Sequence, residues 1–358
     1  MVKTFILTMS LLGVTLMSLN ANAQTPQWDP TAAASYLDER QTWWMSWDVA
    51  QREGETFCIS CHTAVPYALS RSALRIVQGE TAPVPQEEAL LDNVRRRVRL
   101  WAEVAPKRLE ARGSEAILNS LVLASHDAGD SRLSDDARLA FDHLWEVQAD
   151  HGSHSGAWPW LHAELEPWEE DGGAYYGAAL AAVAVGTAPE GYASEPANAD
   201  RVARLRRYLT DNREDQNLFN QLTGLWASTQ LPGLLAPADQ AAVIEETLSR
   251  QRDDGGWSLS SLGPYQLRES SPRLTDSDGY ATGMIAYVLL QTGAGPEQPG
   301  LKRALAWLTA NQEISDGSWP AHSLNKHRDP SSDIGRFMRD AATAYAVLAL
   351  TSAHQEVR

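Results

Sequence analysis

Two kinds of apolar segment alternate along the chain. In the first kind, apolar residues recur every three or four positions, as at 301, 304, 305 and 308 within 301–311. This spacing predicts an amphipathic helix that buries one stripe. In the second kind, as in 343–350, almost every position is apolar, which predicts a helix enclosed on all sides. Each such pair therefore predicts an outer helix followed by an inner helix.

Three pairs are clear. Their outer helices are predicted at 136–147, 240–250 and 301–311, and their inner helices at 178–185, 281–290 and 343–350. An aspartate precedes each inner helix (Asp171, Asp278 and Asp340), where a carboxylate can accept the unpaired amide hydrogens of an N-terminus. Gly186 and Gly293 follow two of them and suit C-caps.

Three weaker pairs fill the gaps, at 32–45 with 63–74, at 86–103 with 114–125, and at 199–212 with 218–228. About six outer and six inner helices predict an all-α protein that closes into a barrel of helical pairs, an α/α toroid. We expect residues 24–358 to form this one domain, with the clear repeats in 135–355.

The loop inside each clear pair carries a glutamine and a tryptophan. The matches are Gln251 to Gly255-Gly256-Trp257, Gln312 to Gly317-Ser318-Trp319 and, more loosely, Gln148 to Trp158. This spacing resembles the "QW" repeats of the squalene–hopene cyclase and prenyltransferase superfamily. The resemblance implies a toroid with a central cavity, in which the N-termini of parallel inner helices gather at one mouth.

Asp276-Ser277-Asp278 is similar to the first three positions of the Asp-x-Asp-Asp acid motif of class II terpene cyclases. The last aspartate of that motif is missing here. Those cyclases also have two toroids, whereas this chain has residues for one. Both departures argue against a cyclisation reaction.

The only two cysteines occur in Cys58-Ile59-Ser60-Cys61-His62. C-x-x-C-H is the attachment sequence of c-type haem, in which two thiols bind the porphyrin and the histidine binds the iron. We therefore predict covalent haem c on Cys58 and Cys61, with His62 as the proximal ligand, at the start of the first inner helix. The alternatives are a disulfide, a zinc site, for which a second ligand pair is lacking, and chance.

The sequence does not single out a distal ligand for the iron. His154, His151 and Met338 are the preferred candidates, because they lie between outer and inner helices and could reach the cavity mouth. The other candidates in such segments are Met45, His162, His322 and His327. Trp43, Trp44 and Trp47 precede the motif and are expected to pack on a porphyrin or in the core.

Acidic residues form the second candidate site. Asp276, Asp278 and Glu170 could perform general acid or base catalysis if burial separates their pKa values. Glu169-Glu170-Asp171 lies close to Trp158, Trp160 and Trp168, an arrangement suited to a sugar platform beside a pair of carboxylates. The alternative is structural, with Asp171 and Asp278 serving as helix caps.

The N-terminus has the pattern of a secretory signal over residues 1–23. Lys3 precedes a short apolar run, and Ala21-Asn22-Ala23 suits cleavage before Gln24. We expect a periplasmic or secreted protein with no stable membrane insertion after cleavage. The formal net charge of −16 argues against nucleic acid or anionic lipid as the main partner.

Three functional hypotheses follow. The first is an exported haem protein that transfers electrons, or performs redox chemistry on a ligand in the cavity, with a periplasmic redox protein or a small hydrophobic molecule as partner. The second is a haem-free lyase, hydrolase or isomerase that acts on a hydrophobic or glycan substrate through Asp276, Asp278 or Glu170. The third is a non-catalytic binding scaffold with a Cys58–Cys61 disulfide.

Overall fold

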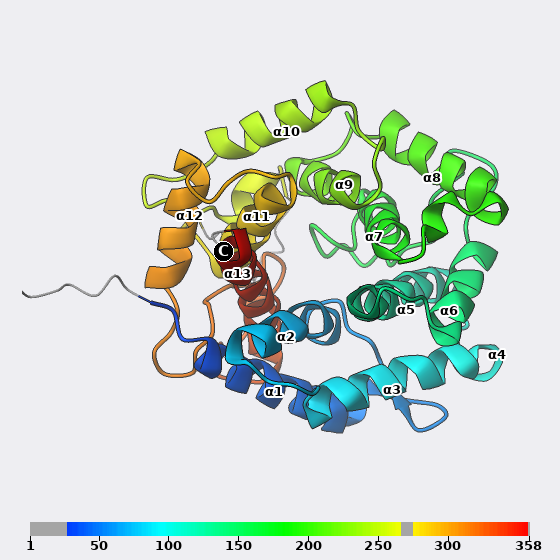
Figure 1. Cartoon of the computed structure of the whole chain (residues 1–358), viewed down its shortest axis with the longest axis horizontal. Helices are drawn as coiled ribbons and strands as arrows, with labels where there is room; N and C mark the ends of the chain where they lie inside the picture. Colours follow the sequence, from blue (N-terminus) through cyan, green and yellow to red (C-terminus); the bar gives the residue numbers. More distant parts are fainter. Residues whose placement is uncertain (1–26, 266–274, 357–358) are drawn as a thin grey trace, which may run out of the picture.

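The computed structural model describes residues 27–265 and 275–356, so the predicted signal sequence lies outside the described residues. The described helices form two concentric rings (Figure 1). The inner helices are α2 (Ala64–Gln78), α5 (Leu109–Asp130), α7 (Gly173–Thr187), α9 (Leu218–Gln230), α11 (Gly279–Gln291) and α13 (Phe337–Glu356). The outer helices are α1 (Pro30–Ser46), α3 (Pro85–Arg99), α6 (Asp135–Glu146), α8 (Ala199–Asp211), α10 (Pro237–Ser249) and α12 (Pro299–Ala310). The predicted all-α toroid of six helix pairs is confirmed.

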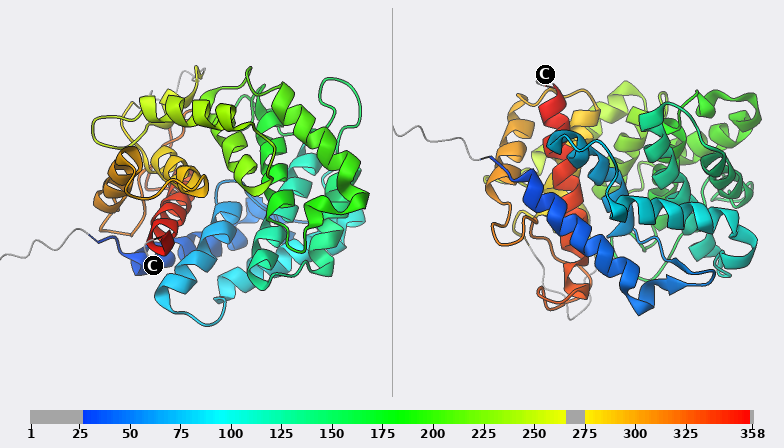
Figure 2. Two further views of the ribbon diagram at one scale, coloured as in Figure 1. Left: turned by 45° about the horizontal axis from the view of Figure 1, so that its top comes forward. Right: turned by 60° about the horizontal axis from the view of Figure 1, so that its bottom comes forward.

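The inner ring is closed. Each inner helix contacts the next along the chain, and α13 packs against α2, so the last repeat adjoins the first. Figure 2 shows α1 and α13 side by side at this junction, although they lie at opposite ends of the chain. Short elements lie between the paired helices: α4 (Trp101–Val104), which follows α3, and a hairpin of β1 (Gln51–Arg52) and β2 (Thr56–Phe57). The described part also has short 3-10 helices, namely η1 (Asp48–Ala50), η2 (Tyr192–Ser194), η3 (Pro196–Asn198), η4 (Leu259–Leu262) and η5 (Ile334–Arg336).

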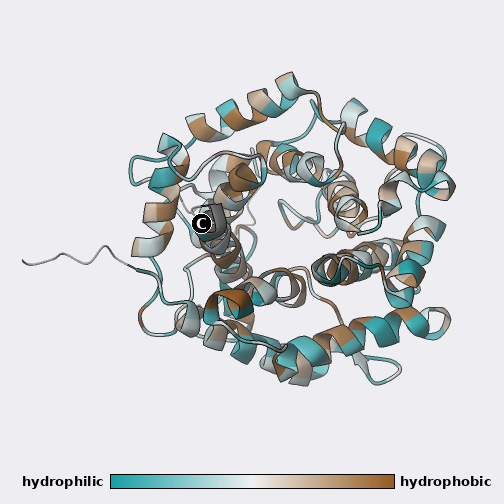
Figure 3. Ribbon diagram, in the orientation of Figure 1, coloured by the Kyte–Doolittle hydropathy of each residue, from teal (hydrophilic) through white to brown (hydrophobic). Residues whose placement is uncertain are grey.

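The hydrophobic pattern explains the two rings (Figure 3). Helix α7 buries Tyr175 through Val185 without a break, as expected for a helix with neighbours on every side. Helix α8, by contrast, buries only Val202, Leu205, Tyr208 and Leu209, which form one stripe. No helix in the described part of the chain combines the length and hydrophobicity of a transmembrane span.

The expected helix caps are confirmed only in part. Asp278 is the N-cap of α11 and accepts a hydrogen bond from the amide of Ala281 at 2.8 Å. The predictions for Asp171 and Asp340 were wrong, because α7 begins one residue too late for Asp171 to be its N-cap and α13 begins before Asp340. Asp171 precedes the N-cap Gly172, and Asp340 lies inside the first turn of α13.

The two glycine C-caps also differ. Gly293 follows the end of α11 with a positive φ of 83°, as a residue just beyond a helix often has. Gly186 instead lies inside α7, so its prediction as a cap was wrong. A Cβ on Gly186 would lie 2.4 Å from the backbone of Gln230, which shows that it permits close packing of α7 on α9.

The repeated tryptophans anchor each loop to the outer helix before it. In all three clear repeats the indole N–H donates to a carbonyl near the C-terminus of that helix: Trp158 to Leu144 at 2.7 Å, Trp257 to Thr247 at 2.8 Å and Trp319 to Leu308 at 2.7 Å. The three rings are among the largest fully buried side chains. The resemblance to QW repeats therefore has a common structural basis.

The repeated glutamines join each loop to the next repeat. Gln312 donates through Nε2 to the carbonyls of Gly317 at 2.8 Å and of Asp29 at 2.9 Å, and Asp29 is the N-cap of α1. Gln251 makes the same pair of bonds to Gly255 and to Gly300 of α12, both at 2.8 Å. Gln148 does so to Gly156 and to Arg201 of α8, at 3.2 and 3.1 Å.

The glycine two residues before each tryptophan should not tolerate a side chain, because a Cβ there would meet the next outer helix. Gly317 has φ +76°, and a Cβ there would lie 2.4 Å from the carbonyl carbon of Ala32 in α1. We expect Gly317→Ala to lower the free energy of unfolding by about 1–3 kcal/mol more than Gly79→Ala does. Gly79 is the matched control, because it has a similar φ of +69° with no atom near its Cβ position. Denaturant unfolding of both variants measures the difference, and equal losses would contradict the packing argument.

Candidate functional site

A cavity of about 410 Å³ lies where four inner helices begin. It is lined by Cys61 and His62 before α2, by Trp168 and Glu169 before α7, by Tyr280 in α11, and by Phe337 and Met338 of α13. The segment between α12 and α13 adds basic and polar side chains. The residues thus come from the first, third, fifth and last helix pairs, and only a closed ring brings them together.

Glu169 is the carboxylate that lines this cavity. Its backbone is fixed by a hydrogen bond from its amide to the Leu165 carbonyl at 2.8 Å. Burial raises the pKa of the Glu169 carboxyl, and the nearby Lys326 ammonium opposes that shift. A half-buried carboxyl of this kind keeps its proton to higher pH than an exposed glutamate does, so it is suited to donate one.

Two aromatic rings lie beside Glu169. The Trp168 indole N–H donates to the Tyr280 hydroxyl at 3.0 Å, and the two rings meet edge to face with centroids 5.6 Å apart. The Trp160 indole in turn donates to the Trp168 carbonyl at 2.8 Å, which fixes the loop before α7. Flat apolar surfaces with a polar rim are typical of sites that bind sugar rings.

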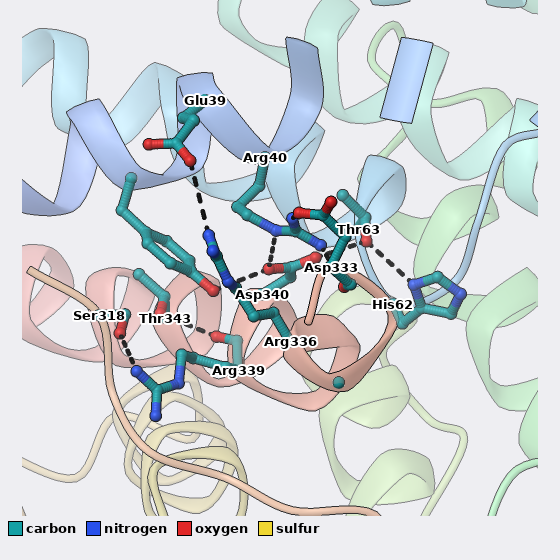
Figure 4. Close-up of polar contacts among 12 residues, drawn as sticks. Glu39, Arg40, His62, Thr63, Ser318, Asp333, Arg336, Arg339, Asp340 and Thr343 are labelled. Atoms are coloured by element: carbon teal, nitrogen blue, oxygen red, sulfur yellow. Dashed lines mark hydrogen bonds and ion pairs between the residues drawn. The ribbon is translucent and has the colours of Figure 1, made fainter. Parts of the chain in front are cut away.

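His62 belongs to a buried hydrogen-bond network at the junction of α1, α2 and α13 (Figure 4). Its Nδ1 lies 2.9 Å from the Thr63 hydroxyl oxygen, and that hydroxyl donates to Asp340 Oδ2 at 2.8 Å. Asp340 Oδ1 accepts from Arg40 Nε and from the Tyr36 hydroxyl, each at 2.8 Å. Burial raises the pKa of the Asp340 carboxyl, and the Arg40 guanidinium opposes that shift.

Aromatic side chains surround the imidazole of His62. The Phe337 ring stacks on it with centroids 3.9 Å apart, and the Trp44 ring meets it edge-on at 5.2 Å. Burial lowers the pKa of His62 to about 3, helped by the positive charges of Arg328 and Arg40. The imidazole is therefore neutral at ordinary pH. The tryptophans before the motif form an aromatic cluster with Phe337, as expected for core packing.

The two thiols of the C-x-x-C-H motif have different surroundings. Both are free. Cys61 lines the cavity, and burial raises the pKa of its thiol to about 12. Cys58 does not line it, and the charges that act on its thiol are those of Arg52, Arg97 and Glu115, on the side of α3 and α5.

The three predicted catalytic residues, Asp276, Asp278 and Glu170, lie apart from the cavity lining. Asp276 is exposed, and Asp278 accepts backbone hydrogen bonds from Ala281 and Leu259 at 2.8 and 2.7 Å. Glu170 has one buried carboxylate oxygen without a hydrogen bond, beside Gly172 at the start of α7. A catalytic role for these three stays a prediction, whereas the structural role of Asp278 as a cap is confirmed.

No protein-family model matches this chain, and no curated protein matches it. Solved structures do. Two are the α-1,6-mannanase GH76A of Salegentibacter sp. HEL1_6 and an inactive variant of it in complex with α-1,6-mannotriose. Each is 14% identical with a TM-score of 0.54, and the matches cover 92% and 89% of this chain and 100% of each mannanase. An inactive variant in complex with α-1,6-mannotetrose gives 14% identity and a TM-score of 0.56 over 90% of this chain and 99% of that one.

This chain shares the α/α toroid fold of those mannanases. At this identity, the likeness concerns the fold alone.

The prediction of covalent haem c on Cys58, Cys61 and His62 is wrong. The matched structures that share the fold are mannanases and not cytochromes. Among the described residues no group of three or more His, Cys, Asp or Glu side chains could hold a metal ion. The motif also does not fit the group, because thioether attachment needs both thiols beside one porphyrin and only Cys61 faces the cavity.

The prediction of an iron-binding, electron-transferring cytochrome is therefore wrong as well. Without haem, the predicted distal-ligand roles of His151, His154 and Met338 no longer apply. His151 and His154 are exposed in the loop after α6, where His154 lies near Tyr208 of α8. Met338 does line the cavity, as do His322 and His327.

Sequence reasoning placed Glu169 in an acidic cluster beside a possible sugar platform, but chose its neighbour Glu170 as the catalytic candidate. It missed Tyr280, Lys326, Arg328 and Phe337 as lining residues. Glu169 had a usable signal, since it directly follows Trp168 and directly precedes an inner helix. The others lie in segments without periodicity or at helix starts, where no pattern distinguishes the side that faces a cavity.

The two roles of Asp278 can be separated by substitution. Asp278→Ala should lower the free energy of unfolding by about 1–2 kcal/mol, because the cap of α11 is lost. Any catalytic turnover should stay within a few-fold of that of the unsubstituted protein. Asp276→Ala is the matched control, and as an exposed substitution it should change stability by less than about 0.5 kcal/mol. Loss of turnover in Asp278→Ala without loss of stability would instead show that Asp278 is catalytic.

Proposed function

We propose that this protein is an enzyme that cleaves glycosidic bonds in a glycan bound in the cavity, with Glu169 as the general acid. The observation that carries this proposal is the half-buried Glu169 carboxyl, whose pKa burial raises, next to Trp168 and Tyr280 in one cavity. A carboxyl that keeps its proton to higher pH than an exposed glutamate does, beside a sugar platform, can protonate the departing oxygen of a glycosidic bond. Two of the matched structures are inactive mannanase variants in complex with oligosaccharides, which supports the choice of substrate class.

The expected location and partners fit this function. The pattern of residues 1–23 indicates export, and an exported enzyme can meet the glycans of cell surfaces. The partner is then a small carbohydrate ligand in the cavity, without a role for nucleic acid, as the net charge of −16 also argues.

Substitution of Glu169 tests the assignment. Glu169→Gln keeps the shape of the side chain but removes its acidic proton, so we expect kcat/KM on a cleaved glycan to fall by about 10²–10⁴-fold. Glu170→Gln is the matched comparison, the same chemical change one residue along at a side chain outside the cavity lining. If Glu170→Gln abolished cleavage and Glu169→Gln did not, the acid would be Glu170, the earlier candidate.

The pH dependence of cleavage gives a second test. Glu169 acts in its protonated form, so kcat/KM should fall as pH rises through the pKa of Glu169, which burial raises from its ordinary value. The charged group that opposes this raised pKa is Lys326, and the Cys61 thiol lies near the carboxyl as well. Lys326→Gln removes the opposing charge and should move the alkaline limb to higher pH. If the alkaline limb did not move in Lys326→Gln, the group that titrates there would not be Glu169.

A further inference from the structure

The described lining of the cavity contains one carboxylate, Glu169. Glycosidases commonly need two, one as acid and one as base or nucleophile. The described lining residues therefore do not supply the second carboxylate that hydrolysis by a carboxylate pair needs. What the cavity offers instead are imidazoles, those of His62, His322 and His327. Among the three, His62 is the one whose Nδ1 is held by the Thr63–Asp340 hydrogen bonds.

The hydrogen bonds of His62 assign its tautomer. Asp340 accepts from Arg40 and therefore acts as a carboxylate, so the Thr63 hydroxyl donates its hydrogen to Asp340. The Thr63 oxygen is then free to accept from His62 Nδ1 at 2.9 Å. This places the ring proton on Nδ1 and leaves a lone pair on Nε2, the nitrogen that Figure 4 shows turned away from the network. The ring is neutral because burial and the charges of Arg328 and Arg40 lower the pKa of His62, and the negative charge of a bound acidic ligand would oppose that lowering.

The cavity lining is basic in a chain whose net charge is −16. Lys326 and Arg328 contribute positive charges, and neither has an ion-pair partner among the described residues. Arg328 donates to the Ile334 carbonyl at 3.0 Å and lies close enough to His62 to lower its pKa. Unpaired cations beside a neutral base favour a ligand that brings its own negative charge.

We propose that the substrate is an acidic glycan, and that it is cleaved by β-elimination at a sugar that carries a C5 carboxylate, with His62 Nε2 as the base. Arg328 and Lys326 bind that carboxylate, and Glu169 donates the proton to the leaving oxygen. This inference rests on the proposed function and names the substrate class and reaction of the same site.

The step balances without any further reactant. The C5–H bond breaks, and its proton goes to His62 Nε2. The electron pair of that bond forms a C4=C5 double bond, and the C4–O bond breaks with its pair on the glycosidic oxygen. That oxygen takes the proton of the Glu169 carboxyl. The charge that builds on the C5 carboxylate is stabilised by Arg328 and Lys326, and exchange with solvent returns one proton from His62 to Glu169.

The product distinguishes elimination from hydrolysis. The full-length mature protein is incubated with polygalacturonate and polymannuronate as acidic polymers and with α-1,6-mannan as the neutral one. Elimination predicts an ultraviolet-absorbing unsaturated end from an acidic polymer, with product masses that sum to that of the substrate. Cleavage of mannan alone, with one water added to the products, would overturn this inference and keep the proposed function. Cleavage of none of the three would overturn both.

Two variants test the residues. His62→Gln should lower kcat/KM for the acidic polymer by about 10²–10⁴-fold, and unfolding measurements show whether the variant folds. Arg328→Gln should raise KM for that polymer by about 10- to 100-fold, with partial recovery in Arg328→Lys. Arg336→Gln is the matched control, because it removes the same charge from a nearby residue outside the cavity lining. Elimination that persists within a few-fold in folded His62→Gln, or equal effects of the two arginine substitutions, would overturn the proposal.

Discussion

The ring closes where the two ends of the chain meet, and a side-chain amide bridges them there. Gln312, after the last outer helix, donates to the carbonyl of Asp29 at the start of the first one. The same bond in the other clear repeats joins neighbours in sequence, whereas this one spans 283 residues. A stack of helix pairs without such closure remains an open solenoid whose terminal faces must be capped. Here the two terminal faces cover one another, and Trp28 packs on Trp319 at the junction, with centroids 6.2 Å apart.

The functional site lies across the same junction. Cys61, His62 and Thr63 belong to the first helix pair, while Asp340 and Phe337 belong to the last inner helix. The Thr63–Asp340 hydrogen bond of 2.8 Å and the Arg40–Asp340 ion pair of 2.8 Å therefore stabilise closure and orient the imidazole at once. One buried hydrogen-bond network thus both stabilises the closed ring and fixes the geometry of the site.

Much of this architecture could be predicted from the sequence, because burial on one face or on all faces leaves a direct hydrophobic pattern. Helices α8 and α9, for example, begin at Ala199 and Leu218, as their patterns predict. Inner helices α7 and α13 begin earlier than predicted, since their first turns carry Gly173 or Arg339 and lack a continuous apolar run. Because the start of α13 was predicted too late in the sequence, Asp340 was given the wrong role of a cap. It is instead a buried acceptor for side chains of α1 and of Thr63.

The site was less predictable for a physical reason. A short motif fixes which atoms are close in sequence but not the direction in which each side chain points, and Cys58 and Cys61 point into different surroundings. The backbone conformation before α7 decides whether Glu169 or Glu170 faces the cavity, and the sequence does not reveal that conformation. Lys326 and Arg328 reach it from a segment with no regular structure.

The dependence of His62 on Asp340 also has a consequence for how the protein matures. Synthesis proceeds from the N-terminus, so the base is made early while the carboxylate that sets its tautomer is made among the last residues. A nascent or truncated chain that lacks α13 has no organised proton acceptor, whatever the state of its earlier helices. Under the proposed mechanism, the site is thus completed in one late event, the docking of the C-terminal helix.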